Sequence, residues 1–197
     1  MLDLDELAPE RIRPIRRVEY DRMVEAGLFA DERVELLRGM LVAMSPQYEP
    51  HAGTVMRLND LLVRALSGRY WVRPQLPLAA SDDSEPEPDL AIIPRDDATD
   101  DDREHPARAL LVIEVADSSL RKDRQLKRRI YAEAEVPEYW VVDVNHDVVH
   151  VHRQVSAGDY LERVEVGRGA AIEPPHLPGL CVRVDEILPR PRPAGAG

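Results

Sequence analysis

The sequence has one cysteine, Cys181, and this shortage removes two classes of protein at once. A single thiol cannot form an internal disulfide, and it lacks the partners that a thiolate-bound zinc requires. We therefore expect Cys181 to be a small core residue. The sequence also has no Gly-rich phosphate loop and no GxSxG motif, so it indicates neither a P-loop nucleotide hydrolase nor a serine hydrolase.

Long apolar runs are absent as well. No run approaches the roughly 20 residues that a membrane helix needs. The first ten residues, MLDLDELAPE, are acidic where a signal peptide would be basic and then apolar. We therefore expect a cytoplasmic protein that has no membrane partner.

A surplus of positive charge is also missing, because the formal net charge is −11. This charge repels a polyanion at long range and counts against indiscriminate coating of DNA. It does not exclude a nuclease, since carboxylates that collect a metal add to the negative total. Basic residues are locally dense at Arg121, Lys122 and Arg124, which we interpret as DNA contacts or, alternatively, as a solvated helix face.

The length and composition indicate one folded domain. The chain has 197 residues, of which 44% are hydrophobic and 32% charged, which is the balance of a globular protein. We predict an N-terminal arm over residues 1–15 and a domain over residues 16–188. Residues 189–197 form a Pro-rich tail that we expect to be disordered.

The hydrophobic pattern predicts a mixed α/β fold of the α+β kind. A helix is expected to end near Gly27, a β-hairpin to turn at Arg38-Gly39, and an amphipathic helix to span residues 51–66. A last, exposed hairpin should turn at Ala157-Gly158. We interpret four further apolar runs as strands, at residues 70–78, 89–93, 109–115 and 139–144.

The run at residues 109–115 is continuously apolar up to its glutamate, which is typical of an inner strand covered by helices on both faces. A helix over residues 120–134 follows it and leads to the strand at 139–144. Such a strand-helix-strand unit predicts two parallel strands joined by a crossover. We expect the acidic stretch over residues 96–104 to be a surface loop.

Two carboxylates lie at positions where this pattern predicts that an unpaired charge is energetically unfavourable. Asp89 follows Pro88 at the start of a strand, which we take to be at a sheet edge, and Glu114 lies near the end of the most apolar strand. An unpaired charge there costs several kcal/mol. A divalent cation held by both carboxylates would offset this cost, and Mg²⁺ takes one or two carboxylates and leaves its other positions to water and phosphate.

A lysine on the following helix completes the pattern. Asp123, Lys127 and Tyr131 are spaced four residues apart, so they share one helix face directly after Glu114. This spacing could place an ammonium beside the metal, where it would orient water or offset charge on a phosphoryl group. An ion pair between Lys127 and Asp123 within the helix is the alternative. Tyr131 itself, like Tyr139 and Trp140, should fill the core.

These residues resemble the PD-(D/E)XK nuclease superfamily. More narrowly, VELLRGMLVAMSP, PEPDLAII, the segment LLVIEVADSSLRKDRQLKRRIYAEAEVPEYWVVD and HLPGL are similar to the Uma-two family of restriction-endonuclease-like proteins. The resemblance implies a restriction-endonuclease-like core, a mixed sheet flanked by helices, with Asp89 and Glu114 as metal ligands and Glu35 as a third acidic site residue. Ala116 stands where the superfamily signature has lysine, and the Uma-two pattern assigns that role to Lys127 on the next helix.

The leading hypothesis is hydrolysis of DNA phosphodiester bonds, with Mg²⁺ or Mn²⁺ bound by Asp89, Glu114 and the Val115 carbonyl. In it, Lys127 positions the attacking water, and Glu35 orients Lys127 or helps a second metal. His51, which matches a recurrent family histidine, and Asp123 would support these ligands, although His51 could also only pack the helix start. The alternatives are a nucleic-acid-binding or assembly module with little catalysis and a hydrolase of smaller phosphate esters. Cutting both strands would favour a homodimer.

Overall fold

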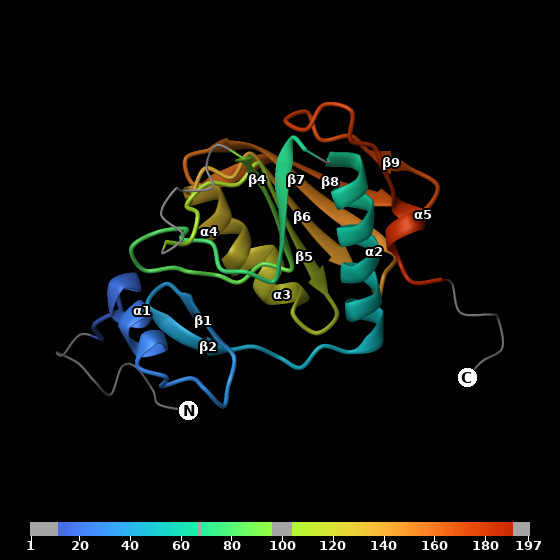
Figure 1. Cartoon of the computed structure of the whole chain (residues 1–197). Coiled ribbons are helices and arrows are strands. Elements are labelled where there is room, and N and C mark those ends of the chain that lie inside the picture. Colours follow the sequence, from blue (N-terminus) through green and yellow to red (C-terminus); the bar gives the residue numbers. More distant parts are fainter. Residues whose placement is uncertain (1–11, 67, 96–103, 191–197) are drawn as a thin grey trace.

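The structure is a computed structural model that describes residues 12–66, 68–95 and 104–190 (Figure 1). Most of the predicted N-terminal arm, most of the acidic loop and the end of the Pro-rich tail lie outside the described residues. The division into arm, domain and tail therefore stays a prediction.

A mixed six-stranded sheet with the order β3-β4-β5-β6-β7-β8 forms the centre of the fold. Only β5 and β6 run parallel, and the other neighbours are antiparallel. As predicted, the continuously apolar run is an inner strand, and all of β5 is buried. The strands are β3 (Tyr70–Pro74), β4 (Leu90–Pro94), β5 (Leu111–Ala116), β6 (Glu138–Asp143), β7 (Val148–Ser156) and β8 (Asp159–Gly167).

Helices cover both faces of this sheet (Figure 1). On one face α2 (Glu49–Leu66) packs Leu58 and Leu62 against Ile113 and Trp140. The same core takes in the C-terminal segment, with β9 (Ala171–Ile172), β10 (Val182–Arg183) and α5 (Val184–Ile187). None of the helices in the described part of the chain combines the length and the apolar character that a bilayer span requires.

The opposite face is covered by the crossover helix that joins β5 to β6, which confirms the predicted connection. It runs through α3 (Leu120–Lys122), a π-helical turn η3 (Asp123–Lys127) and α4 (Arg128–Glu133). Tyr131 and Tyr139 fill the core between helix and sheet and are fully buried, as expected. Glu114 and Ala116 share this helix-covered face, because side chains two residues apart in a strand point the same way.

A separate β-hairpin lies beside α1 (Arg17–Glu25) at one end of the sheet (Figure 1). Its strands are β1 (Val34–Leu37) and β2 (Met40–Ala43), and Arg38 and Gly39 both have positive φ at the predicted turn. A side chain at Gly39 would meet Pro14, since a Cβ built there lies 2.2 Å from the proline Cβ. The Glu85 amide donates to the Leu36 carbonyl at 2.8 Å and fastens the hairpin to the domain.

Two predictions about the second half of the chain are wrong. The hairpin of β7 and β8 is not an exposed addition, because β7 pairs with β6 and extends the central sheet. His150 and His152 of β7 are buried on the face of the sheet that the crossover helix covers. Cys181 is exposed and not a core residue, because its neighbours Leu180 and Val182 point into the core and the alternating backbone turns the thiol outward.

Candidate active site

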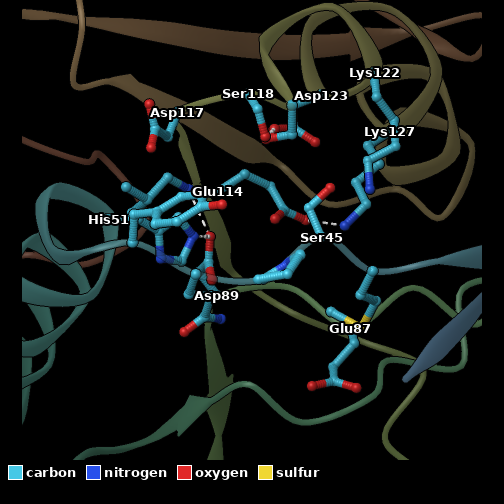
Figure 2. Close-up of a pocket in the computed structure, with 16 residues that line it drawn as sticks. Ser45, His51, Glu87, Asp89, Glu114, Asp117, Ser118, Lys122, Asp123 and Lys127 are labelled. Carbon is cyan, nitrogen blue, oxygen red and sulfur yellow. Dashed lines mark hydrogen bonds and ion pairs between the residues drawn. The ribbon is translucent and has the colours of Figure 1, made fainter. Parts of the chain in front are cut away.

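A small cavity lies at the C-terminal end of β5, beneath the start of the crossover helix and beside the segment that joins β2 to α2 (Figure 2). Its space is about 70 Å³, which is enough for several water molecules or an ion with part of its water shell. It is small for a nucleotide, so a large substrate would extend across its mouth. The charged side chains that line it are those of Glu87, Asp89, Glu114, Asp117, Asp123, Lys122 and Lys127.

The Asp89 side chain accepts a hydrogen bond from β5 at the point where the backbone pairing between β4 and β5 has ended. It stands just before β4, an inner strand and not the edge strand that we expected, and the pairing of β4 with β5 ends at Leu90 and Ile113. Asp89 Oδ2 accepts a hydrogen bond of 2.8 Å from the Val115 amide. The N–H and C=O of one residue in a strand point to the same side, so the Val115 carbonyl also faces Asp89.

His51 holds the same carboxylate from the other side. It lies in the first turn of α2, and its Nε2 is 3.0 Å from Asp89 Oδ2. The predicted contribution of His51 to the site therefore has a geometric basis, because two groups fix one oxygen of Asp89. Figure 2 shows His51 and Asp89 on one side of the cavity and the lysines on the other.

Lys127 bridges two carboxylates. Its Nζ is 2.9 Å from Glu114 Oε1 and 2.8 Å from Glu35 Oε2, and its side chain is only 3% exposed. The alternative pairing with Asp123 is not among the ion pairs of the described residues. An ammonium has three hydrogen-bond donors, so Lys127 retains one for a water or a substrate oxygen.

Glu35 binds two lysines at once. Its second oxygen, Oε1, is 2.8 Å from Lys122 Nζ, and the Glu87 amide donates to Oε2 at 3.3 Å. Burial would raise the pKa of Glu35, but the charges of Lys127 and Lys122 outweigh it and lower that pKa. Glu35 is therefore an ionised anchor for both ammonium groups, which suits the predicted role of orienting Lys127.

The sequence contains only two lysines, Lys122 and Lys127, and both reach Glu35. All the other residues among the 26 lysines and arginines of the chain are arginines. Lysine carries a compact ammonium that fits between two carboxylates, whereas the planar guanidinium does not replace it there. This compositional signal in the sequence could have linked Lys122 to the site, and our sequence reasoning missed it.

Glu114 lies in the least polar part of the site. Burial raises its pKa to about 8, with Lys127 opposing this shift and the carboxylates of Asp123 and Asp89 adding to it. The Tyr131 hydroxyl donates to Glu114 Oε1 at 2.8 Å, a polar role that we did not predict for a core tyrosine. For Lys127, burial lowers the pKa but the carboxylates of Glu114 and Glu35 outweigh it and raise that pKa. Negative charge is thus in excess around the cavity.

Some of the cavity residues are of the kind that a hard cation takes as ligands. Within residues 12–66, 68–95 and 104–190, no three His, Cys, Asp or Glu side chains converge as a ready ligand set. Structural zinc takes four such ligands, whereas Mg²⁺ accepts one or two carboxylates together with carbonyl and water oxygens. Asp89, Glu114 and the Val115 carbonyl match that second pattern. Asp123 adds a buried Oδ1 that has no hydrogen-bond partner among the described residues.

Ala116, which stands where the superfamily signature has lysine, lies in the core between the sheet and the crossover helix. It is fully buried on the face that carries Glu114, against the crossover helix. A lysine at this position would point into the same layer that Lys127 enters from the helix. Side chains at positions 116 and 127 would therefore enter the same layer, one from the sheet and the other from the helix.

The helix places the basic residues that we interpreted as possible DNA contacts on two different flanks, and their contact with DNA stays a prediction. Successive residues are 100° apart around an α-helix. Lys122 turns toward Glu35 and the cavity, while Arg121 and Arg124 line a different hollow on another flank of the helix.

Comparison with known proteins gives a family match and a similar fold. A sequence profile of the Uma2 family, described as "Putative restriction endonuclease", matches residues 17–185. None of the curated proteins compared matches the chain.

Among solved structures, a protein from Anabaena variabilis described as "a putative nuclease belonging to DUF820" superposes with a TM-score of 0.71. The match has 13% identity and covers 88% of this chain and 97% of the other, so the likeness concerns the fold. The type IIG restriction endonuclease BpuSI superposes with a TM-score of 0.40 and 16% identity over 56% of this chain and 12% of its own. That superposition is too weak to bear on fold or function.

Proposed function

The chain belongs to the Uma2 family, described as "Putative restriction endonuclease", and on this premise we propose that it is a divalent-metal-dependent endonuclease that hydrolyses DNA phosphodiester bonds. One observation carries the proposal. A buried lysine lies between two buried glutamates, next to an aspartate whose orientation two further groups fix. Burying three charged groups together is energetically costly, and perturbed buried charges of this kind cluster at functional sites.

Asp89, Glu114 and the Val115 carbonyl would hold Mg²⁺ or Mn²⁺ in this proposal. The ion would polarise a phosphoryl oxygen and lower the pKa of a bound water. The excess of carboxylates around the cavity supports the need for a cation, because these charges alone would repel a phosphodiester. His51 and the Val115 amide keep one Asp89 oxygen in place, so the other oxygen is the one available to the ion.

Lys127 would act on the substrate and not on the ion. Its third donor is available to the attacking water or to a non-bridging phosphate oxygen, where negative charge develops in the transition state. Glu35 and Glu114 fix the ammonium from two directions, and Tyr131 fixes Glu114 in turn. The donor is therefore aimed before substrate arrives, which avoids reorganisation during the reaction.

The family description favours a polymer over a small phosphate ester. The cavity has a space of only about 70 Å³, so the surface around its mouth would supply most of the contacts to such a substrate. We propose DNA as the polymer and a homodimer as the form that would cut both strands. A binding module without catalysis is the second candidate, and Ala116 at the signature lysine position favours it.

Cleavage of supercoiled plasmid DNA in the presence of Mn²⁺ tests the proposal. We expect nicked or linear product with the wild type and none with Asp89→Asn or with excess EDTA. Asp60→Asn is the matched control, because Asp60 is an exposed carboxylate on α2 whose partner is Arg64. It should cleave like the wild type. If the wild type slows the migration of the plasmid in a gel but does not cut it, the protein would be a binding module and not a nuclease.

A further inference from the structure

A second hollow lies on the flank of the crossover helix that faces β7 and β8. It is lined by Arg121, Arg124 and Arg128 from the helix and by His152 and Arg163 from the two strands. We call it the arginine groove. Its space is about 490 Å³, and it shares no lining residue with the active-site cavity.

Buried donors in the arginine groove lack partners. His152 is 4% exposed, and neither of its ring nitrogens has a hydrogen-bond partner among the described residues. Its ring stacks on that of Tyr139, with 5.6 Å between centroids, which fixes its orientation. Arg128 is also buried, and its Nε has no partner within the described ranges. Leaving buried polar groups without hydrogen-bond partners is destabilising, so an acceptor bound here would be favourable.

The arginine groove also has positive charge to spare. Asp159 serves two of its arginines, with 2.8 Å to Arg128 Nη1 and 2.7 Å to Arg163 Nη2. Glu165 lies 3.8 Å from Arg124 and is largely exposed. Arg121 has no carboxylate partner in the described part of the chain. Four arginines thus face two carboxylates, in a chain whose formal net charge is −11.

We propose that the arginine groove binds a phosphate group of the nucleic-acid strand away from the scissile phosphate. This inference rests on the proposed function. Guanidinium groups match phosphate oxygens in a forked geometry, and a neutral imidazole always has one N–H to donate. The groove would give a negatively charged protein the local positive surface that it needs to hold a polyanion.

The placement of the groove sets which phosphate it would bind. Lys127 points into the active-site cavity, and Arg128, the next residue, lines the groove on the adjacent flank. On the sheet, β7 is two strands from β5, which corresponds to roughly 10 Å. The groove would therefore hold a phosphate near the cut but not the scissile phosphate itself.

The salt dependence of duplex binding tests this assignment. Binding of a fluorescent duplex is measured between about 50 and 200 mM salt in an Asp89→Asn background, with Arg121→Gln or Arg124→Gln added. Arg129→Gln is the matched control, because Arg129 is exposed on the same helix and does not line the groove. Each groove variant should flatten the slope of log affinity against log salt by about 0.9, and the control should leave it unchanged.

Equal slopes for the groove variants and the control, or no duplex binding, would overturn the assignment. A nucleoside monophosphate serves as the second probe, with the NMR signals of the His152 ring as the local readout. We expect duplex to shift these signals more than the monophosphate does. A shift with monophosphate alone would make the groove a site for a free phosphorylated ligand. Cleavage by Asp89→Asn would instead contradict the proposed function, and it leaves the slope comparison valid.

Discussion

Glu114→Gln is expected to lose DNA cleavage by about 10³-fold or more while the protein stays folded. The amide keeps the volume of the side chain, and its oxygen can still accept hydrogen bonds from Lys127 and Tyr131. What it loses is the negative charge that a divalent cation requires. Because the interaction is with the ion and the transition state, the loss should appear in kcat as well as in metal affinity.

The folded state should tolerate the Glu114→Gln substitution. In the folded protein the pKa of Glu114 is about 8, above its ordinary value of 4.5. Between pH 4.5 and about 8 the folded state keeps a proton that the unfolded chain releases, so the free energy of unfolding falls as pH rises across this window and levels off above about 8. Without metal, Glu114→Gln should match the wild type near pH 4.5 and be more stable near pH 9.

The measurement is a single-turnover cleavage rate at saturating Mn²⁺, together with denaturant unfolding at both pH values. Glu162→Gln is the control, since Glu162 lies on β8 away from the cavity. If Glu114→Gln cleaves DNA at the wild-type rate, Glu114 is not a residue of the active site. An unfolded variant would instead make its role structural.

Lys127→Met is expected to reduce cleavage by about 10²–10³-fold and to leave Mn²⁺ binding in place. It should also destabilise the metal-free protein by on the order of 3–5 kcal/mol, because Glu35 and Glu114 would lose the ammonium that offsets their burial. Added Mn²⁺ should restore part of this stability, since the ion supplies positive charge beside Glu114.

Lys122→Met is the matched control for the second variant. Lys122 also contacts Glu35 at 2.8 Å, but it is partly exposed and has no contact with Glu114. Its removal should cost far less stability than the removal of Lys127. Isothermal titration with Mn²⁺ and cleavage rates separate the two roles. If metal affinity collapses in Lys127→Met, the ammonium serves to assemble the site and not to stabilise the transition state.

The sequence was sufficient to predict the part of the site that is local in the chain. Glu114 at the end of an apolar strand and Lys127 on the next helix are thirteen residues apart, and helical spacing places Lys127 and Tyr131 on one face. The parallel pair β5 and β6 with its crossover followed from the same segment. Short-range periodicity is informative there because the segment is buried on both faces.

Contacts between distant segments could not be obtained in this way. The pairing of Glu35 with Lys122 depends on how the β1–β2 hairpin docks on the domain, and no pattern within either segment encodes that docking. The arginine groove depends on the phase of the crossover helix relative to β7 and β8. The alternating strand pattern leaves open whether His152 is a surface or a core residue, and only the packed helix shows that it is buried.

Thermal melting with and without Mn²⁺ tests most directly whether the cavity is a divalent-metal site. A ligand that binds only the folded state stabilises it by RT ln(1 + [L]/Kd), so Mn²⁺ at about 100 Kd adds roughly 2.7 kcal/mol. This predicts a rise of about 5–10 °C in the wild-type Tm and almost none for Asp89→Asn. Without metal, Asp89→Asn should be as stable as the wild type or more so, because one of several like charges is gone. Equal shifts for both proteins would mean that the ion binds elsewhere, and Asp89 would not be a ligand.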